Sequence, residues 1–558
     1  MSILPSPLRR APVSLALAVL ACLIGLAIAL LPRPQLVLVA GAALALAALA
    51  AILARPVLGL SLALIVGPFQ PLERVTLSLP LDSGQVALAV TLLACGFRWL
   101  ASRSGSPPQR TAAHLRQALR GHRAVVYVLM AFVAVCLLSF FPAYDFRDWA
   151  TECIKWLQIG AVALLVAGAS DPARRGIIVG AILLSAAGQA VFGLIQADVR
   201  GFGPPEFRIR GTDAYRAYGT FEQPNPFGGF MGLTWPVAAA VAAWSWRRAW
   251  PSLRALVSSP RGQSAGQETT RLIFALAPAL TATLVTALCL AALNASGSRG
   301  ALVGAAAAAF AVVLSAFRRA WLWAGAALVL ALALLGFDLV NIPPSLEAQL
   351  QWFNRPGVTF GVDVRNAHVT PITFSTIERL AHWQAAIRMI ESSPWLGVGF
   401  GNYAAAYPAF RLLPWENALG HAHNYYLNLF AEVGVIGLSL YLALWAAIII
   451  ATWRVAQRCG LRALPSALCI GILGAWAHLT AHHLFDKLYV ANMHLYVGAY
   501  LGLALAAGAE GKHGDENRAA GTQPRRIARR RGGMSAQLRA RRQPADIATA
   551  TSRPSLMA

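Results

Sequence analysis

The sequence predicts an all-α polytopic membrane protein with about 12 to 14 transmembrane helices. Hydrophobic residues make up 57% of the 558 residues, charged residues make up only 13%, and the mean hydropathy is +0.56. This composition excludes a soluble globular enzyme, because it describes a chain dominated by lipid-facing surface. The formal charge of +24 would also suit a nucleic-acid-binding protein, so the positions of the charges decide between these two classes.

Apolar runs long enough to cross a bilayer, which takes about 20 helical residues, follow one another along most of the chain. Each of these runs predicts one transmembrane helix. A weaker run at residues 57–68 predicts a further span or half of a bent one. The stronger runs lie at residues 12–31, 34–54, 84–101, 124–141, 152–169, 176–196, 226–245, 272–293, 300–317, 321–339, 426–453, 463–484 and 492–508.

The charges are distributed unevenly over the segments between these runs. With an even number of spans, most of the 47 Lys and Arg residues lie on the side of the membrane that holds both termini, whereas most of the 23 Asp and Glu residues lie elsewhere. An excess of Lys and Arg on the cytoplasmic side is the positive-inside rule. We therefore expect both termini to be cytoplasmic, and the positive charge requires no nucleic acid as a partner.

Two of the expected outside segments, residues 197–225 and residues 340–424, are too long and too polar to serve only as connectors. In the second, apolar residues recur near helical spacing from Ile377 to Glu391, with charges between them, which predicts an amphipathic helix near the membrane surface. Residues 394–403 are rich in Gly, Pro and aromatic residues and predict a tight loop. We expect the function to reside in these two outside segments.

The C-terminal residues 508–558 carry many arginines and almost no apolar side chains. This composition predicts a basic, disordered cytoplasmic tail close to anionic lipid headgroups. The chain is thus expected to consist of N-terminal transmembrane helices at residues 1–200, a catalytic region at residues 201–505 that includes the large helical loop 340–424, and this tail.

The first outside segment places Arg208, Arg210 and Arg216 just before the stretch from Tyr218 to Asn225. Arginine stays protonated and matches the oxygens of phosphate with two parallel hydrogen bonds, so such a cluster suits a diphosphate ligand. In the alternative interpretation, these arginines extend to lipid headgroups or pair with nearby acidic residues. The acidic residues within reach are Glu206, Asp213 and Glu222.

A short turn from Asn294 to Gly300 joins two strongly apolar helices and contains Ser298 and Arg299. A charge held at the membrane boundary between two spans costs free energy, so Arg299 is a functional candidate by default. The alternative is an arginine that merely extends to the interface from a turn chosen for its glycines.

The second outside segment ends with His421, His423 and Asn424, at the entry to a long apolar run. A histidine at the top of a membrane helix can act as a base near neutral pH, since its reference pKa is about 6.5, and we expect His423 to lie nearest the reacting group. The histidines could instead hold a metal, but no third ligand lies nearby in sequence, or His423 could simply make interfacial hydrogen bonds. Downstream, Gly434 and Gly437 predict a helix face on which a neighbouring helix packs closely.

Together these residues resemble the O-antigen ligase family, which shares its signature region with Wzy-type polymerases and bacterial protein O-oligosaccharyltransferases. The resemblance is carried by the Asn294–Gly300 turn with its apolar helix, the large outside segment, and the step from His423 to Gly434. The stretch Tyr218–Asn225 is similar to the family's upstream loop. The resemblance covers approximately residues 205–505.

The resemblance implies a GT-C-like membrane fold and transfer of a glycan from undecaprenyl diphosphate at the periplasmic face of the bacterial inner membrane, without a metal or cofactor. It implies that Arg216 and Arg299 bind the diphosphate and that His423 lies beside the acceptor hydroxyl; Arg379 matches less specifically. The further expected substrate-binding residues are Arg208, Arg210, Tyr218, Asn225, Ser298, His421 and Asn424.

The expected function is that of an O-antigen ligase in lipopolysaccharide biosynthesis, a metal-independent glycosyltransferase. Its expected partners are the undecaprenyl-diphosphate-linked donor, the lipid A-core acceptor and inner-membrane lipids. An O-antigen polymerase or a protein O-oligosaccharyltransferase with the same donor is the alternative within this class. A lipid or glycan transporter is the alternative from another class, because Lys155, Glu432 and the polar group from His478 to Asp486 lie near predicted spans.

Overall fold

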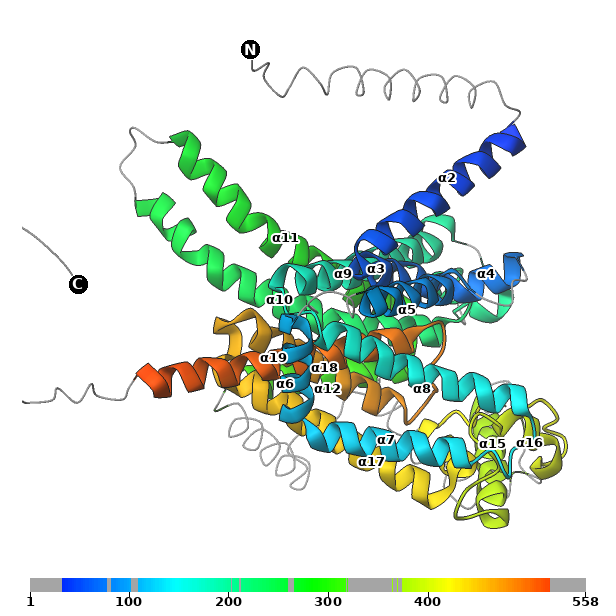
Figure 1. Cartoon of the computed structure of the whole chain (residues 1–558). Coiled ribbons are helices and arrows are strands. Elements are labelled where there is room, and N and C mark those ends of the chain that lie inside the picture. Colours follow the sequence, from blue (N-terminus) through cyan, green and yellow to red (C-terminus); the bar gives the residue numbers. More distant parts are fainter. Residues whose placement is uncertain are drawn as a thin grey trace, which may run out of the picture. The chain divides into compact units, whose positions relative to one another are not determined.

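The described part of the chain consists of helices joined by turns and loops, with no β-strand (Figure 1). The prediction of an all-α polytopic membrane protein is therefore confirmed. The chain divides into two compact units, Met1–Lys512 and His513–Ala558. The computed structural model describes residues 33–77, 82–101, 109–201, 203–209, 212–258, 265–317, 319, 364, 369 and 374–521.

The N-terminal helices follow the apolar runs of the sequence. Asp145 and Asp171 cap α8 and α9, since each carboxylate accepts a hydrogen bond from a backbone N–H of the first turn at 2.9 Å. The helices are α2 (Arg33–Ala54), α3 (Pro56–Val66), η1 (Gly67–Phe69), α4 (Gln70–Leu77), α5 (Ser83–Ala101), α6 (Gln109–Gly121), α7 (Arg123–Leu138), α8 (Phe146–Ala167), α9 (Pro172–Leu194), η3 (Ile195–Arg200) and η4 (Pro205–Phe207).

The helices after residue 223 include two that belong to the large outside segment, α15 and α16, as well as long apolar helices. The helix expected from Ile377 to Glu391 is confirmed and lies within α15. The helices are α10 (Pro224–Ser258), α11 (Ala265–Ala295), α12 (Arg299–Ala316), α15 (Phe374–Ser392), α16 (Tyr403–Phe410), α17 (Tyr425–Cys459), η6 (Gly460–Arg462), α18 (Leu464–His482) and α19 (Met493–Gly521).

Among the described residues, nine helices are long and apolar enough to cross a membrane, or ten if the bent pair α6–α7 counts as one span. The weak run at residues 57–68 lies in one of them, Pro56–Thr76. The expected spans at residues 12–31 and 321–339 lie outside the described residues. α19 continues to Gly521, beyond the expected start of a disordered tail, and the rest of that tail lies outside the described residues.

Three helices, α10, α12 and α18, pack tightly against one another. Gly471 of α18 brings the two backbones together, since a Cβ there would lie 2.7 Å from the carbonyl oxygen of Pro236 in α10. The ring of His478 fits against Gly232 and Gly304, where added Cβ atoms would approach it to 1.8 Å and 2.6 Å. This packing fixes the beginning of α12 relative to the end of α18.

The N-terminal part of α17 is interrupted at Gly434, whose φ of 65° is left-handed. A Cβ at Gly434 would lie 2.2 Å from the backbone of Trp395. In the same loop, the N–H of Val398 donates a hydrogen bond to the carbonyl of Ala431 in α17 at 2.9 Å. The expected close helix contact at Gly434 is therefore wrong, because a loop occupies this position. At Gly437 a Cβ would lie 3.7 Å from Val135 of α7, so a helix does approach there.

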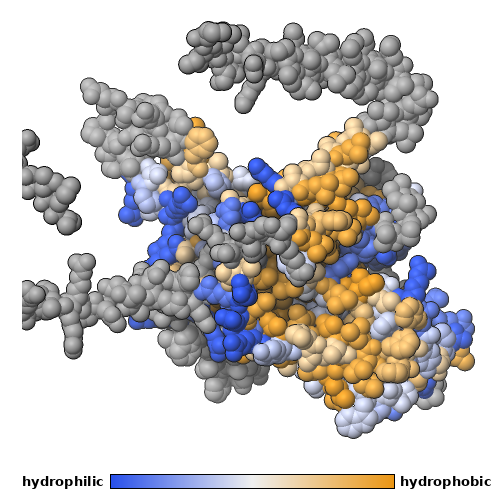
Figure 2. All heavy atoms as spheres, in the orientation of Figure 1, coloured by the Kyte–Doolittle hydropathy of each residue, from blue (hydrophilic) through white to orange (hydrophobic). Residues whose placement is uncertain are grey.

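Large apolar side chains are exposed on many of these helices. On the face shown in Figure 2, hydrophobic surface covers α3, α5, α7 and α8. Leu93 and Phe97 of α5 are 62% and 68% exposed, and Met130 of α7 is 64% exposed. Contiguous apolar surface of this kind is rare on soluble monomers and is the surface expected to face lipid.

Candidate active site

Arg216 joins the first outside segment to the turn that precedes α12. Its Nε donates to the carbonyl of Ser296 at 2.7 Å, and its terminal nitrogen donates to Asn225 Oδ1 at 2.8 Å. The next residue supports the same junction, since Ala217 N–H donates to Ala295 C=O at 2.9 Å. The guanidinium is thus held by two elements that are far apart in sequence.

Arg299 is the first residue of α12 and is exposed. Ser298 is the N-cap, because its hydroxyl accepts a hydrogen bond from Ala301 N–H at 3.3 Å. A helix N-terminus carries partial positive charge and free N–H groups, which favours an anion at this position. The expected candidates Ser298 and Arg299 therefore lie where an anionic ligand would be stabilised.

Arg379 of α15 completes a group of three guanidiniums. Burial lowers the pKa of Arg216, and the like charges of Arg299 and Arg379 lower it further. Burial also lowers the pKa of Arg379, an effect opposed by the carboxylate of Asp486 and increased by Arg299. The three side chains come from three separate segments and are close enough to repel one another, so an anion placed between them would relieve that repulsion.

His421 forms a close pair with Asp486, which follows α18. Its Nε2 donates to Asp486 Oδ1 at 2.6 Å, and its Nδ1 lies 3.3 Å from the carbonyl of Leu419. Burial would raise the pKa of Asp486, but the hydrogen bond from His421 and the electrostatic interaction with His421 and the neighbouring histidines hold this pKa well below its ordinary value. Asp486 is therefore a carboxylate that orients His421.

His423 lies beside this pair, with its ring centroid 4.5 Å from that of His421 and 5.7 Å from that of His382. Burial lowers the pKa of His423 to about 3, and the nearby His421 contributes in the same direction. Its Nδ1 is buried and has no hydrogen-bond partner among the described residues. His423 is therefore neutral at pH 7, and its lowered pKa makes it a weaker base than an ordinary histidine.

Asn424 is the N-cap of α17, and its side-chain oxygen accepts a hydrogen bond from Leu427 N–H at 3.1 Å. The first residue of this helix, Tyr425, donates its backbone N–H to the carbonyl of His483 at 2.8 Å. The start of α17 is thus tied to the end of α18. This arrangement explains how His423 and Asp486 come together although they are distant in sequence.

The remaining expected residues are not all brought into this group. Arg208 pairs with Asp213 at the surface, as the alternative interpretation expected, and its side chain is 52% exposed. Arg210 lies outside the described residues. Tyr218 packs against Phe207, with ring centroids 5.3 Å apart. Of the two arginines in the first segment that the structure describes, Arg216 is placed with Arg299 and Arg208 pairs with Asp213 instead.

Three potential metal ligands lie close together, because the ligand atoms of His421, His423 and Asp486 are all within 4.8 Å of one another. Sequence inspection missed the third ligand, since Asp486 follows a different helix. The contact of 2.6 Å between His421 and Asp486 is typical of a charge-assisted hydrogen bond. The nearby Arg379 and Arg299 oppose a divalent cation and favour an anion at this site.

Two members of the site, Asp486 and His382, were not among the expected site residues. The sequence signal for Asp486 is a run of three histidines and a carboxylate, from His478 to Asp486, at the end of an apolar helix. In the sequence, these residues indicate polar side chains near a predicted span, which is the pattern of a transporter. His382 stands in α15 without any distinguishing spacing in the sequence, and its contact with His423 places it beside the site.

Comparison with protein families gives a match that includes several of these residues. Residues 284–442 match the family model described as O-antigen ligase, a range that contains Arg299, Arg379, His421 and His423. No curated protein matches the chain. The matched family implies a glycosyltransferase-like enzyme with lipid-linked glycan substrates.

Proposed function

On the premise that residues 284–442 belong to the O-antigen ligase family, we propose that this protein transfers O-antigen polysaccharide from undecaprenyl diphosphate to the lipid A-core oligosaccharide. The observation that carries the proposal is the convergence of Arg216, Arg299 and Arg379 next to the neutral ring of His423. A cluster of permanent cations suits a diphosphate leaving group, and a neutral imidazole suits an attacking hydroxyl.

In the proposed reaction, a sugar hydroxyl of the acceptor attacks the anomeric carbon of the donor, and the bond from that carbon to the diphosphate oxygen breaks. His423 accepts the hydroxyl proton. Negative charge develops on the departing diphosphate, and Arg216 and Arg299 stabilise it there together with the N-terminus of α12. Removing one such preorganised donor typically costs about 2.7 to 4 kcal/mol of transition-state stabilisation.

The residues around these groups have supporting roles in the proposal. The pair of His421 and Asp486 keeps the ring of His421 beside His423, and the carboxylate of Asp486 partly offsets the lowering of the His423 pKa by burial and by His421. Asn225 holds the guanidinium of Arg216, and Asn424 holds the first turn of α17. Ser298 caps the helix that begins with Arg299, and Tyr218 remains a proposed substrate contact.

The proposal places the reaction at the periplasmic face of the inner membrane, without a metal ion. The polyprenyl chain of the donor then remains among the apolar helices while its diphosphate reaches the polar ends of α12 and α15. The multiple apolar helices support a multi-pass membrane location. The exposed apolar side chains of these helices provide surface along which a lipid-linked substrate can approach.

Deletion of the gene tests the proposal. We expect long-chain lipopolysaccharide to disappear while undecaprenyl-linked polymer accumulates. A strain that lacks the core acceptor separates the related activities: a polymerase would still lengthen the lipid-linked glycan, and a protein O-oligosaccharyltransferase would still modify a protein. Unchanged lipopolysaccharide in the deletion strain would refute the proposal.

A further inference from the structure

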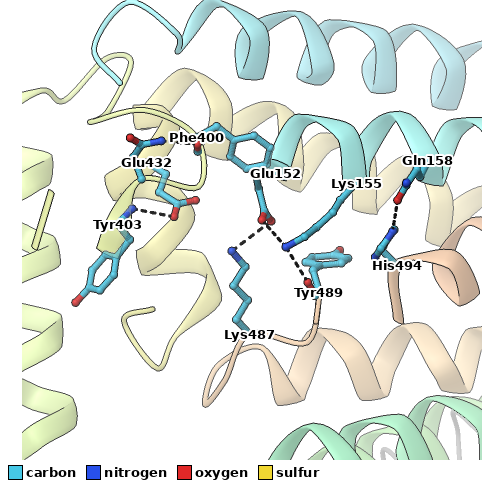
Figure 3. A network of polar contacts seen from close by, with 10 residues as sticks. Glu152, Lys155, Gln158, Phe400, Tyr403, Glu432, Lys487, Tyr489 and His494 are labelled. Carbon is cyan, nitrogen blue, oxygen red and sulfur yellow. Dashed lines mark hydrogen bonds and ion pairs between the residues drawn. The ribbon is translucent and has the colours of Figure 1, made fainter. Parts of the chain in front are cut away.

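A second polar group lies inside the helical part of the molecule, next to the proposed site. Glu152 and Lys155 extend from α8 toward Lys487, which belongs to the segment between α18 and α19 (Figure 3). Glu152 lies 2.8 Å from Lys155 Nζ and 3.2 Å from Lys487 Nζ. The carboxylate of Glu432 in α17 completes the group and is 1% exposed.

The stability of the folded protein alone does not explain these four largely buried charged side chains. Charged side chains within membrane helices are costly, and a buried ion pair often contributes no more than apolar residues of similar volume. The side chains of Glu152 and Lys487 are only 5% and 10% exposed. The cost of burying them suggests a role beyond packing α8 against its neighbours.

The position of Lys487 in the chain indicates that role. It directly follows Asp486, whose carboxylate accepts hydrogen bonds from His421 at 2.6 Å and from the backbone N–H of Lys487 itself at 2.8 Å. The side chain of Lys487 is fixed at the other end by Glu152. Lys155 adds a second attachment of the same segment to α8, because it donates to the carbonyl of Tyr489 at 3.3 Å.

We infer that Glu152 and Lys487 are positioning residues for glycan transfer: their ion pair fixes the segment 483–492, so that Asp486 holds His421 beside His423. The inference rests on the proposed function for its effect on rate. Misplacement of a catalytic group by about 1 Å can cost about 100-fold in rate. We expect loss of the pair to lower kcat by about 10- to 100-fold and to change KM for the donor little, because the three arginines remain in place.

The experiment compares purified full-length variants in glycan transfer from the undecaprenyl-diphosphate-linked donor. Glu152→Gln and Lys487→Met each break the pair, and Lys487→Arg restores a cation. Gln158→Leu is the matched control, because Gln158 also lies on α8 and makes a partly buried hydrogen bond of 2.6 Å to His494, which belongs to α19 and not to the segment 483–492. We expect Gln158→Leu to retain most of the activity and Lys487→Arg to recover part of it.

A double-mutant cycle with Asp486→Asn tests whether the pair acts through Asp486. Residues that work as a unit give non-additive effects, so Lys487→Met should lower the rate of Asp486→Asn by less than threefold, although it lowers the wild-type rate about 10- to 100-fold. Full additivity would overturn the inference, as would equal losses in Lys487→Met and Gln158→Leu. A rise in donor KM without a fall in kcat would also contradict it.

Chemical modification separates this inference from the proposed function. Diethyl pyrocarbonate acylates imidazole nitrogens, and the Asp486 contact protects one nitrogen of His421. We expect mass spectrometry to show faster modification of His421 in Glu152→Gln than in the wild type or in Gln158→Leu. If the wild-type protein transfers no glycan but this difference is present, the proposed function fails and the positioning stands; an unchanged modification rate would refute the positioning.

Discussion

The Nε of Arg216 donates to the carbonyl of Ser296 at 2.7 Å, and this bond links the first outside segment to the turn that starts α12. Because Asn225 binds the same guanidinium, Arg216 is fixed from both sides and directed toward Arg299. A flexible surface arginine would not be held in this way. The geometry leads to different expectations for the individual arginines.

Replacement of Arg216 or Arg299 with Ala should lower turnover by about 10²- to 10³-fold, as expected for the loss of one preorganised donor. Lysine should restore little activity at Arg216, because a single ammonium group cannot reproduce the two fixed hydrogen bonds to Ser296 and Asn225. Single-turnover transfer by the purified variants provides the measurement. Near-normal rates for both Arg299→Ala and Arg299→Lys would assign that residue to the membrane interface.

Arg208→Ala should keep most of the wild-type rate, because Arg208 pairs with Asp213 at the surface instead of joining the other arginines. The same transfer assay measures this outcome. A loss as large as that of Arg216→Ala would return Arg208 to the diphosphate site that the sequence predicted.

His423→Ala should lower the single-turnover rate by about 10²- to 10⁴-fold, the usual contribution of a general base. His421→Ala should be less damaging, because both nitrogens of the His421 ring are directed to Asp486 and Leu419 and it acts through its neighbour. His423→Gln distinguishes a base from a hydrogen-bonding group: if it retains activity, the general-base role is wrong although the site is right. An inactive His421→Ala beside a largely active His423→Ala would reverse the assignment.

Acidification should destabilise the folded protein. Burial and the nearby His421 lower the pKa of His382 to about 4, and the pKa of His423 is lowered to about 3, whereas both are about 6.5 in an unfolded chain. Between these values the unfolded state binds more protons, so stability falls as the pH decreases from about 6.5 toward 3. The melting temperature in detergent should decrease over this range.

The variant His382→Phe provides the control for this pH dependence. It removes one buried imidazole, so its melting temperature should decrease less between pH 6.5 and pH 4 than that of the wild type. An identical pH dependence in the two proteins would show that His382 does not titrate in this range.

The sequence predicted most of the helices because hydrophobic run length is a local property, as α9, α11 and α12 illustrate. It also predicted Arg216 from the cluster of arginines in the first outside segment, and Arg299 and His423 because each borders an apolar run. It could not predict that Asp486 would pair with His421, because that contact depends on how α17 and α18 pack. The break at Gly434 was missed for a similar reason: the loop at Trp395 that fills it is distant in sequence.

Transfer should continue in EDTA. The three arginines supply the positive charge that a divalent ion supplies in other glycosyltransferases, and the cluster of His421, His423 and Asp486 has a hydrogen bond at its centre. Activity of the purified enzyme before and after chelation provides the measurement. If activity is lost and then restored by magnesium, manganese or zinc, the metal-ligand interpretation of these three residues is correct and the anion-site interpretation is wrong.

The last prediction concerns the orientation of the chain in the membrane: the loop between α16 and α17 faces the periplasm, and the C-terminal end of α17 faces the cytoplasm. The two sites are separated by α17, which spans Tyr425–Cys459. A cysteine introduced at the exposed Glu416 should react with an impermeant maleimide in intact cells. The native Cys459, which is exposed at the other end of α17, is an internal control that should react only after permeabilisation. The opposite labelling pattern would place Arg299 and His423 on the cytoplasmic side, where a lipid-linked donor that has already been transported could not reach them, and would remove the basis for a periplasmic ligase.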